Sequence, residues 1–458
     1  MELKRSEIMP GVWLSTLKTD KFKTACLSLS LLSQLRRETA ASYALIPSVL
    51  RRGCARYPDL DALAARMDEL YGTAVEPVVR RIVEIQAVGF YASIPEGAFL
   101  PGGEDVLRPA CELLGQLLLS PNTRGGLLRP QYVDSEKEKQ LERIRSRINS
   151  KGSYAVQRCI EEMCCFEDFA VGSLGSEEDT ESINYKKLTK QYHTLLQTSP
   201  VEIFYCGRAD EEELTAILRD ALMTLPRGEI DYEIGTDVRL NAIEAQPRCF
   251  EEKMAVTQGR LVMGWRLGEA MEEPDLPALM VFNAVFGGNT TSKLFLNVRE
   301  KKGLCYSVYS MTELHKGLLL AAAGIDFERC EETRDEILRQ LDCMAKGEIS
   351  EEELDAARKG VASELRMTMD SQGELEGFYL AQALDGTDCG PLELAALAET
   401  VTKEQLAAIA RAAECDMIYF LRGKDEEDEE DEEDEEEIEL SDEELDALLA
   451  GEEEEHAE

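Results

Sequence analysis

Two stretches of the chain follow the same plan, and this internal repeat constrains the fold more than any other feature. LTKQYHTLLQTSPVEIFYCGRADEEE begins at Leu188, and VTKEQLAAIARAAECDMIYFLRGKDEED begins at Val401, 213 residues later. In each, a Thr-Lys pair leads into a predicted helix, followed by an apolar strand that ends at a glycine. Upstream, Ser135 and Ser350 lie 215 residues apart, and both precede acids, as is typical of a helix N-cap. Two independent matches separated by nearly the same number of residues predict that the chain consists of two related halves of about 200 residues.

Both halves contain extended and helical patterns. ACLSLSLL and AVEPVVRRIVEIQAVGFYASI predict strands in the first half, and RLVMGWRL, LLLAAAGID and DMIYFL predict strands in the second. Leu60, Leu63, Met67 and Leu70 recur at helical spacing, and similar patterns follow in both halves. Strands clustered among long helices favour antiparallel sheets. The sequence therefore predicts an α+β fold of two homologous halves, each a mostly antiparallel sheet covered by helices on one face.

Composition divides the chain further. The segment 226–246 is polar and carries proline and glycine, which predicts a linker between an N-terminal half at 1–225 and a C-terminal half at 247–424. Residues 425–458 contain 23 Asp and Glu and no Lys or Arg, which predicts an acidic, disordered, solubilising tail. Within this tail, Ser441 and Glu444 match a capping box, so a short helix that docks on a partner or mimics a substrate is the alternative.

Charge and cysteine usage exclude several classes of protein. The net charge is −41, of which 23 charges lie in the tail, so residues 1–424 carry about −18, which argues against a nucleic-acid surface. No run of 18 apolar residues occurs, so no membrane span is expected. The 13 cysteines form no CxxC pair, which favours reduced thiols in a cytoplasmic protein over a disulfide framework or a cysteine metal site.

The most informative stretch is VFGGNTTSKLFLNVREKKGLCYSVYS, residues 285–310. It predicts a helix with Leu294, Phe295 and Val298 on one face. Gly303 suits the position after the helix end, where a positive φ costs glycine little. LCYSVYS then alternates as a strand. The pattern places Arg299 in the last helical turn and the following tyrosine at the start of the strand.

This stretch closely resembles the second-half signature of the pitrilysin/insulinase family of zinc peptidases, including its processing-peptidase branch. The resemblance extends more weakly over residues 1–424 and includes the duplicated α+β halves. It implies that Arg299 and Tyr306 contact a bound peptide and the carbonyl oxygen under attack, where preorganised donors stabilise developing negative charge. From residue types alone, the alternative is a helix-end ion pair for Arg299 and simple packing for Tyr306.

The same resemblance implies an inverted zinc motif, H-x-x-E-H, in the first half. Its positions fall on ALIPS, so that Ala44 and Ser48 replace the histidines and Pro47 replaces the catalytic glutamate. A third ligand, usually glutamate, is expected some 75 residues or more downstream. Glu138 and Glu142 lie in the corresponding helix, but they are better interpreted as solvated acids. The sequence has lost its zinc motif.

Histidine usage supports the same conclusion. The whole chain has three histidines, His193, His315 and His456, and they lie far apart in the sequence. They do not supply the spacing of a zinc site, and structural roles at a helix or turn are favoured for His193 and His315. No metal or other cofactor is therefore expected to be bound by this chain.

The resemblance implies a function for a chain of this kind. In two-chain members of the family, one subunit keeps the zinc motif, the other keeps the Arg/Tyr pair, and the protomers enclose a chamber. The chain is similar to bacterial insulinase-family proteins that are encoded as a pair with an intact homologue. We therefore expect a zinc-less, substrate-binding subunit that is not catalytic alone, whose partner is an H-x-x-E-H homologue that binds zinc. The alternatives are a scaffold or assembly protein with the same fold, and an active homodimer.

Overall fold

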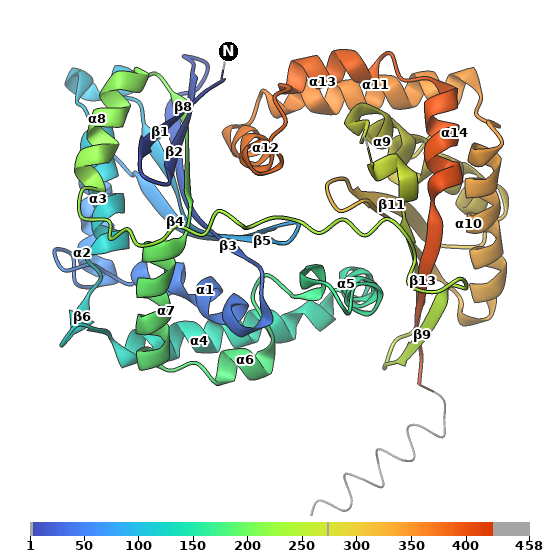
Figure 1. The fold of residues 1–458 in the computed structure, drawn as a ribbon, viewed down its shortest axis with the longest axis horizontal. Helices are drawn as coiled ribbons and strands as arrows, with labels where there is room; N and C mark the ends of the chain where they lie inside the picture. The colour runs from blue at the N-terminus through green and yellow to red at the C-terminus, as the bar shows by residue number, and fades with distance from the viewer. Residues whose placement is uncertain (1–2, 273, 425–458) are drawn as a thin grey trace, which may run out of the picture.

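The computed structural model describes residues 3–272 and 274–424. They form two α/β halves that lie side by side, with a segment without helix or strand crossing between them (Figure 1). The predicted acidic tail at 425–458, with His456 and its capping-box residues, lies outside the described residues. None of the helices in the described part of the chain is long and apolar enough to cross a membrane.

The first half is built on a six-stranded sheet with the order β1-β2-β8-β3-β5-β4. All neighbouring strands are antiparallel except β2 and β8, which are parallel. The central strand β3 is the predicted ACLSLSLL strand, and it is almost wholly buried. The strands are β1 (Leu3–Met9), β2 (Val12–Lys18), β3 (Thr24–Gln34), β4 (Ala74–Ile82), β5 (Ile85–Pro95) and β8 (Val201–Gly207). A two-stranded ribbon joins β6 (Thr123–Arg124) and β7 (Leu127–Leu128).

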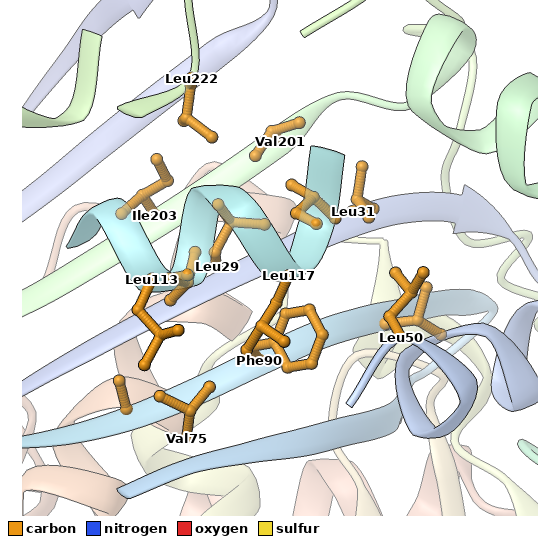
Figure 2. Packing of buried hydrophobic residues seen from close by; sticks show 14 of the residues in the cluster. Leu29, Leu31, Leu50, Val75, Phe90, Leu113, Leu117, Val201, Ile203 and Leu222 are labelled. Atoms are coloured by element: carbon orange, nitrogen blue, oxygen red, sulfur yellow. The ribbon is translucent and has the colours of Figure 1, made fainter. Parts of the chain in front are cut away.

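Helices of the first half cover one face of this sheet. Figure 2 shows α3 lying over the strands, with Leu113 and Leu117 among Leu29, Phe90 and Ile203. These contacts explain the apolar spacing of the α3 sequence, because its inward face is almost completely buried. The helices are α1 (Arg37–Leu50), α2 (Leu60–Glu69), α3 (Leu107–Leu119), α4 (Pro130–Arg145), α5 (Lys151–Met163), α6 (Glu177–Glu181), α7 (Tyr185–Thr198) and α8 (Glu211–Ala221).

The second half repeats this topology. Its sheet has the order β11-β12-β10-β13-β9, and only β9 and β13 are parallel. This order matches β4-β5-β3-β8-β2 strand for strand, so the predicted duplication is confirmed. The strands are β9 (Arg248–Lys253), β10 (Gly259–Arg266), β11 (Ser307–Glu313), β12 (Leu318–Ile325) and β13 (Glu414–Arg422). The helices are α9 (Leu276–Asn283), the wider π-type turns η6 (Ala284–Gly288) and η7 (Leu294–Lys301), α10 (Cys330–Ala345), α11 (Glu351–Thr368), α12 (Gln372–Asp385), α13 (Pro391–Ala398) and α14 (Lys403–Ala412).

Each half lends one helix to the sheet of the other. Helix α5 packs on β10 and β13, and α12 packs on β8 and β3, so both helices lie between the halves (Figure 1). Strand alternation shows that they occupy the second face of each sheet. In β10, Leu261 and Met263 face the helices of their own half, whereas Val262 faces α5. In β8, Ile203 likewise faces the helices of its own half, whereas Phe204 faces α12. The sequence did not predict this exchange.

A buried network of charges joins the halves. Lys316, in the turn between β11 and β12, is fully buried, with its Nζ 2.5 Å from Glu84 Oε1 and 2.7 Å from Glu167 Oε2. Arg266 is also fully buried and contacts Glu167 Oε1 at 2.6 Å and Asp416 Oδ2 at 2.9 Å. Burial alone would raise the pKa of Glu167, but hydrogen bonds from Arg266 and Lys316 outweigh burial and hold it below its ordinary value. Since Glu84 and Glu167 belong to the first half, these contacts fix the relative position of the two sheets.

Two of the expected helix starts are wrong. Ser135 lies inside α4, which begins at Pro130, because proline is well suited to the first helical position. Thr189 lies inside α7, which is capped by the Asn184 side chain. The corresponding residues of the second half are true N-caps: Ser350 of α11 and Thr402 of α14 both form capping boxes. The two halves therefore keep equivalent helices but begin them with different residues.

This difference gives a matched pair of substitutions. Ser350→Ala removes the hydroxyl that accepts the Glu353 N–H at 3.1 Å, and we expect it to lower the free energy of unfolding by about 1 kcal/mol. Ser135→Ala removes no cap and is expected to change it by less than about 0.5 kcal/mol. Urea unfolding of both variants measures the difference. Equal losses in both would mean that the α11 cap has no special role.

Candidate functional site

The signature segment forms a helical turn followed by an edge strand. The predicted helix is η7, with Leu294 and Val298 fully buried and Phe295 half-buried. Gly303 has a φ of +62° and donates its N–H to the Arg299 carbonyl at 3.0 Å, as predicted for a residue that ends a helix. The strand β11 begins at Ser307, three residues later than the alternating pattern indicated. Arg299 and Tyr306 therefore flank a single turn.

Arg299 is partly exposed to solvent. Its side chain is 39% exposed, and its Cζ lies 4.8 Å from the centre of the Phe295 ring. Its Nη1 is 3.5 Å from Glu300 Oε1, a pair that is exposed on both sides and therefore weak. The Phe295 ring supports the guanidinium from one face and leaves its edge donors accessible.

Tyr306 is also exposed, at 61%, and its phenol is oriented by one hydrogen bond. The Oη donates to Asp326 Oδ1 at 2.8 Å, and this bond raises the pKa of the phenol above its ordinary value. Its backbone N–H donates to Gly324 O at 2.8 Å, which ties the residue to β12. At neutral pH the phenol is a protonated donor held in one direction.

A small polar network connects the Tyr306 side chain to the backbone of Arg299. Arg329 donates to Gly303 O at 2.6 Å, and its Nε lies 3.6 Å from Asp326 Oδ2. Asp326 in turn accepts from Tyr306, and Gly303 donates to Arg299 O. Sequence reasoning missed Asp326 and Arg329. The register of β11 against β12 brings Asp326 to Tyr306, since Asp326 lies two residues beyond the partner of Ser307, and the sequence pattern does not specify this register.

A buried carboxylate anchors the end of η7. Lys302 Nζ lies 2.6 Å from Glu336 Oε2 on α10. Burial tends to raise the pKa of Glu336, but hydrogen bonds from Arg339, Lys302 and Gln340 outweigh burial and lower it to about 2. Because the folded-state pKa is depressed, ionised Glu336 stabilises the fold above its ordinary pKa of 4.5, and that contribution disappears as the pH falls toward about 2.

Glu336→Gln should therefore destabilise the protein in a pH-dependent way. We expect the difference in the free energy of unfolding between wild type and Glu336→Gln to be constant between pH 5 and 7 and to shrink below about pH 4. Glu332→Gln, on the exposed face of the same helix, is the matched control and should show little difference at any pH. Denaturation curves across this range provide the test, and a difference that grows on acidification would refute the role of Glu336.

The residues at the expected zinc motif do not fit a zinc ion. Ala44 is buried in α1 and Pro47 lies within the helix, and Ser48 is half-buried, so none of the three offers a nitrogen, sulfur or carboxylate ligand. The polar groups nearby serve the fold instead. Gln140 donates its amide N–H to Ala41 O at 2.9 Å and to Leu174 O at 3.0 Å. A carboxylate side chain in place of the Gln140 amide would have no proton to donate to these two carbonyls at neutral pH.

Other candidate ligands are dispersed. Glu138 and Glu142 are exposed on α4, as expected, and His193 is exposed on α7. His315 lies between the halves, with Nδ1 3.1 Å from Asp385 Oδ2. In residues 3–272 and 274–424, no group of three or more His, Cys, Asp or Glu is arranged to hold a metal ion. The described part of the chain thus pairs an exposed Arg/Tyr turn with a first half that lacks zinc ligands.

Comparison with known proteins gives a consistent result. A family model described as the inactive domain of peptidase M16 matches residues 182–361. The probable inactive metalloprotease YmfF of Bacillus subtilis is 30% identical over 417 residues, covering 91% of this chain and 96% of that protein. Among solved structures, a conserved protein from Enterococcus faecalis has a TM-score of 0.84 at 25% identity, covering 93% of this chain and 99% of the other. A peptidase M16 inactive domain from Pseudomonas fluorescens has a TM-score of 0.74 at 18% identity, with the same coverage.

Proposed function

The chain belongs to the M16 (pitrilysin/insulinase) family as a homologue of its inactive metalloproteases, and on this premise we propose that it is the zinc-less, substrate-binding subunit of a heterodimeric peptidase. In this proposal an intact H-x-x-E-H homologue supplies the zinc and its activated water. The chain supplies Arg299 and Tyr306 to the same site. The observation that carries the proposal is an exposed pair of oriented donors on a protein that has no ligands at its zinc-motif positions.

The chemistry of the pair suits peptide binding. Peptide hydrolysis places negative charge on the carbonyl oxygen, and a preorganised donor aimed at that oxygen stabilises it by ~3–4 kcal/mol. Arg299 can bind one peptide carbonyl through its accessible edge while Phe295 supports its face. Tyr306 can turn its proton from Asp326 to the carbonyl under attack, since both groups are exposed to solvent. The two residues bind and orient the peptide, and they do not activate water.

A reconstitution experiment tests this function. The chain is mixed with an intact H-x-x-E-H homologue from the same cell, and complex formation is followed by size-exclusion chromatography and peptide cleavage. We expect a heterodimer that cleaves an unstructured peptide, whereas this chain alone does not. If the intact homologue reaches the same rate without this chain, the proposed subunit role is wrong.

A second candidate function is a non-catalytic scaffold or assembly protein. It is favoured by one observation: both site residues already have partners within the chain, Tyr306 on Asp326 and Arg299 on Phe295 and Glu300. This function predicts a heterodimer whose activity is insensitive to both side chains. A cytoplasmic location is part of the proposal and is supported by the 13 cysteines, all of which are free thiols.

A further inference from the structure

A cavity of about 540 Å³ lies where α4 ends and α5 begins, away from the Arg299 and Tyr306 turn. Its walls come from the two helices, from residues 172–173 and from β4. Its charged lining consists of four arginines and one glutamate: Arg81, Arg145, Arg147, Arg158 and Glu161. Such a concentration of arginines is unexpected on residues 1–424, which carry a net charge of about −18.

Two of the four arginines are paired with acids. Arg145 contacts Glu177 and Glu181 on α6, the second at 3.2 Å. Arg158 contacts three glutamates, including Glu252 at 3.0 Å. These charges are balanced within the fold and are not available to a ligand.

The other two arginines form no ion pair within residues 3–272 and 274–424, although the charges of Glu313 and Glu161 act on Arg81. Arg81 donates to the Phe169 carbonyl at 2.9 Å and lies 4.2 Å from the centre of its ring. Arg147 lies against Gly172, where a Cβ would come within 3.0 Å of its Nη1. Burial lowers the pKa of Arg81, the charge of Glu313 opposes this effect, and the charge of Arg147 adds to it. Two neighbouring guanidinium groups that form no ion pair therefore face a cavity large enough for several carboxylate side chains.

The start of α5 adds polar groups of the same character. Ser150 is the N-cap residue, but its side chain caps no backbone N–H. Ser150 and Ser153 both line the cavity, so their hydroxyls and the positive end of a 13-residue helix face the same space. The combination indicates a site for an anion.

The end of the described chain lies beside this cavity. Strand β9 connects the two, since Glu252 pairs with Leu421 in the sheet and accepts hydrogen bonds from Tyr154 and Arg158 of the cavity wall. Figure 1 shows β9 and β13 ending near α5. The chain therefore leaves β13 close to Tyr154 and Arg158 of the cavity wall, and residues 425–437 are 13 consecutive Asp and Glu.

We propose that this cavity binds the acidic segment 425–437 of the same chain, whose carboxylates contact Arg81 and Arg147. Proximity favours this occupant over a separate acidic protein, because the segment follows Lys424 directly and its effective concentration at the cavity is high. The segment thereby neutralises the cavity and keeps other anionic peptides out of it.

Hydrogen exchange of the full-length chain tests the proposal. In one variant, every Asp and Glu of 425–437 is replaced by Asn or Gln, which leaves residues 3–424 unchanged. At 20 mM NaCl we expect the amides of 148–158 to exchange at least threefold faster in this variant than in the wild type. At 0.5 M NaCl the difference should largely disappear, because salt screens the attraction. Equal exchange at low salt would overturn the proposal.

Substitutions in the cavity give an independent readout. Cleavage of 425–437 by a glutamyl endopeptidase should be at least fivefold faster in Arg81→Gln/Arg147→Gln than in the wild type. The exposed pair Arg56→Gln/Arg124→Gln is the control and should leave the cleavage rate within twofold of the wild type. Circular dichroism confirms that each variant is folded. Cleavage that is unaffected in the cavity variant, or equally faster in the control, would exclude the cavity as the binding site.

Discussion

In the reconstituted heterodimer, Arg299→Ala is expected to lower kcat/KM for peptide cleavage by about 10²–10³-fold, the usual loss when one preorganised donor is removed from a developing oxyanion. Tyr306→Phe deletes only the phenolic oxygen and should lose a similar factor, mainly in kcat, because its proton turns to the carbonyl only as charge develops. Tyr306 is exposed and Arg299 is partly exposed, so neither substitution opens a cavity in the core. Steady-state kinetics of the two variants measures both effects.

Lys301→Ala is the matched control for these variants. Lys301 is an exposed cation on the same helical turn, two residues from Arg299, and it has no assigned role in binding. We expect its heterodimer to retain at least half of the wild-type kcat/KM, and all three variants to assemble with unchanged affinity. Full activity in both Arg299→Ala and Tyr306→Phe would remove the substrate-binding role and leave the scaffold function.

Lys316→Met is expected to cost about 3–5 kcal/mol in the free energy of unfolding, because it leaves buried carboxylates without their cation. The lysine is fully buried between Glu84 and Glu167 and also donates to the Asp237 carbonyl. Methionine keeps the length and apolar surface of the side chain. The loss in the free energy of unfolding is therefore due to the missing charge and not to a cavity. Chemical unfolding monitored by circular dichroism measures it.

A double substitution and a surface control distinguish charge from packing. Lys316→Met/Glu84→Gln removes the negative charge of Glu84 together with the lysine. We therefore expect the double variant to recover part of the lost free energy of unfolding. Lys346→Met breaks the exposed pair with Asp342 and should cost less than about 0.5 kcal/mol. A loss below about 1 kcal/mol for Lys316→Met would show that the network does not hold the halves together.

Features that depend on neighbouring residues could be predicted from the sequence. The duplication, the strands and the turn at Gly303 follow from periodicity and from the backbone preferences of glycine, and the structure agrees. Arg299 and Tyr306 were located because the signature around them is continuous. Their binding role remains a prediction, as do the boundaries of the linker and the two halves. The expected helix starts at Ser135 and Thr189 were wrong because an upstream proline and asparagine start those helices earlier.

Features made by distant residues could not be predicted in this way. The exchange of α5 and α12 depends on which sheet face is left open, and a helical pattern does not specify its partner. The charged network draws on residues from five separate segments, among them Glu84, Glu167 and Lys316, and each alone resembles a surface residue. Asp326 belongs to the candidate site only through strand pairing, which a single sequence does not display.

Zinc binding by the isolated chain tests the central claim most directly. The purified protein is incubated with one equivalent of Zn²⁺, passed through a desalting column, and assayed for bound metal and for cleavage of an unstructured peptide. The absence of donors at Ala44, Pro47 and Ser48 predicts substoichiometric zinc and no cleavage above background. One zinc per chain, together with cleavage that a chelator abolishes, would show that the chain is a complete peptidase and contradict the proposed division of the site between two subunits.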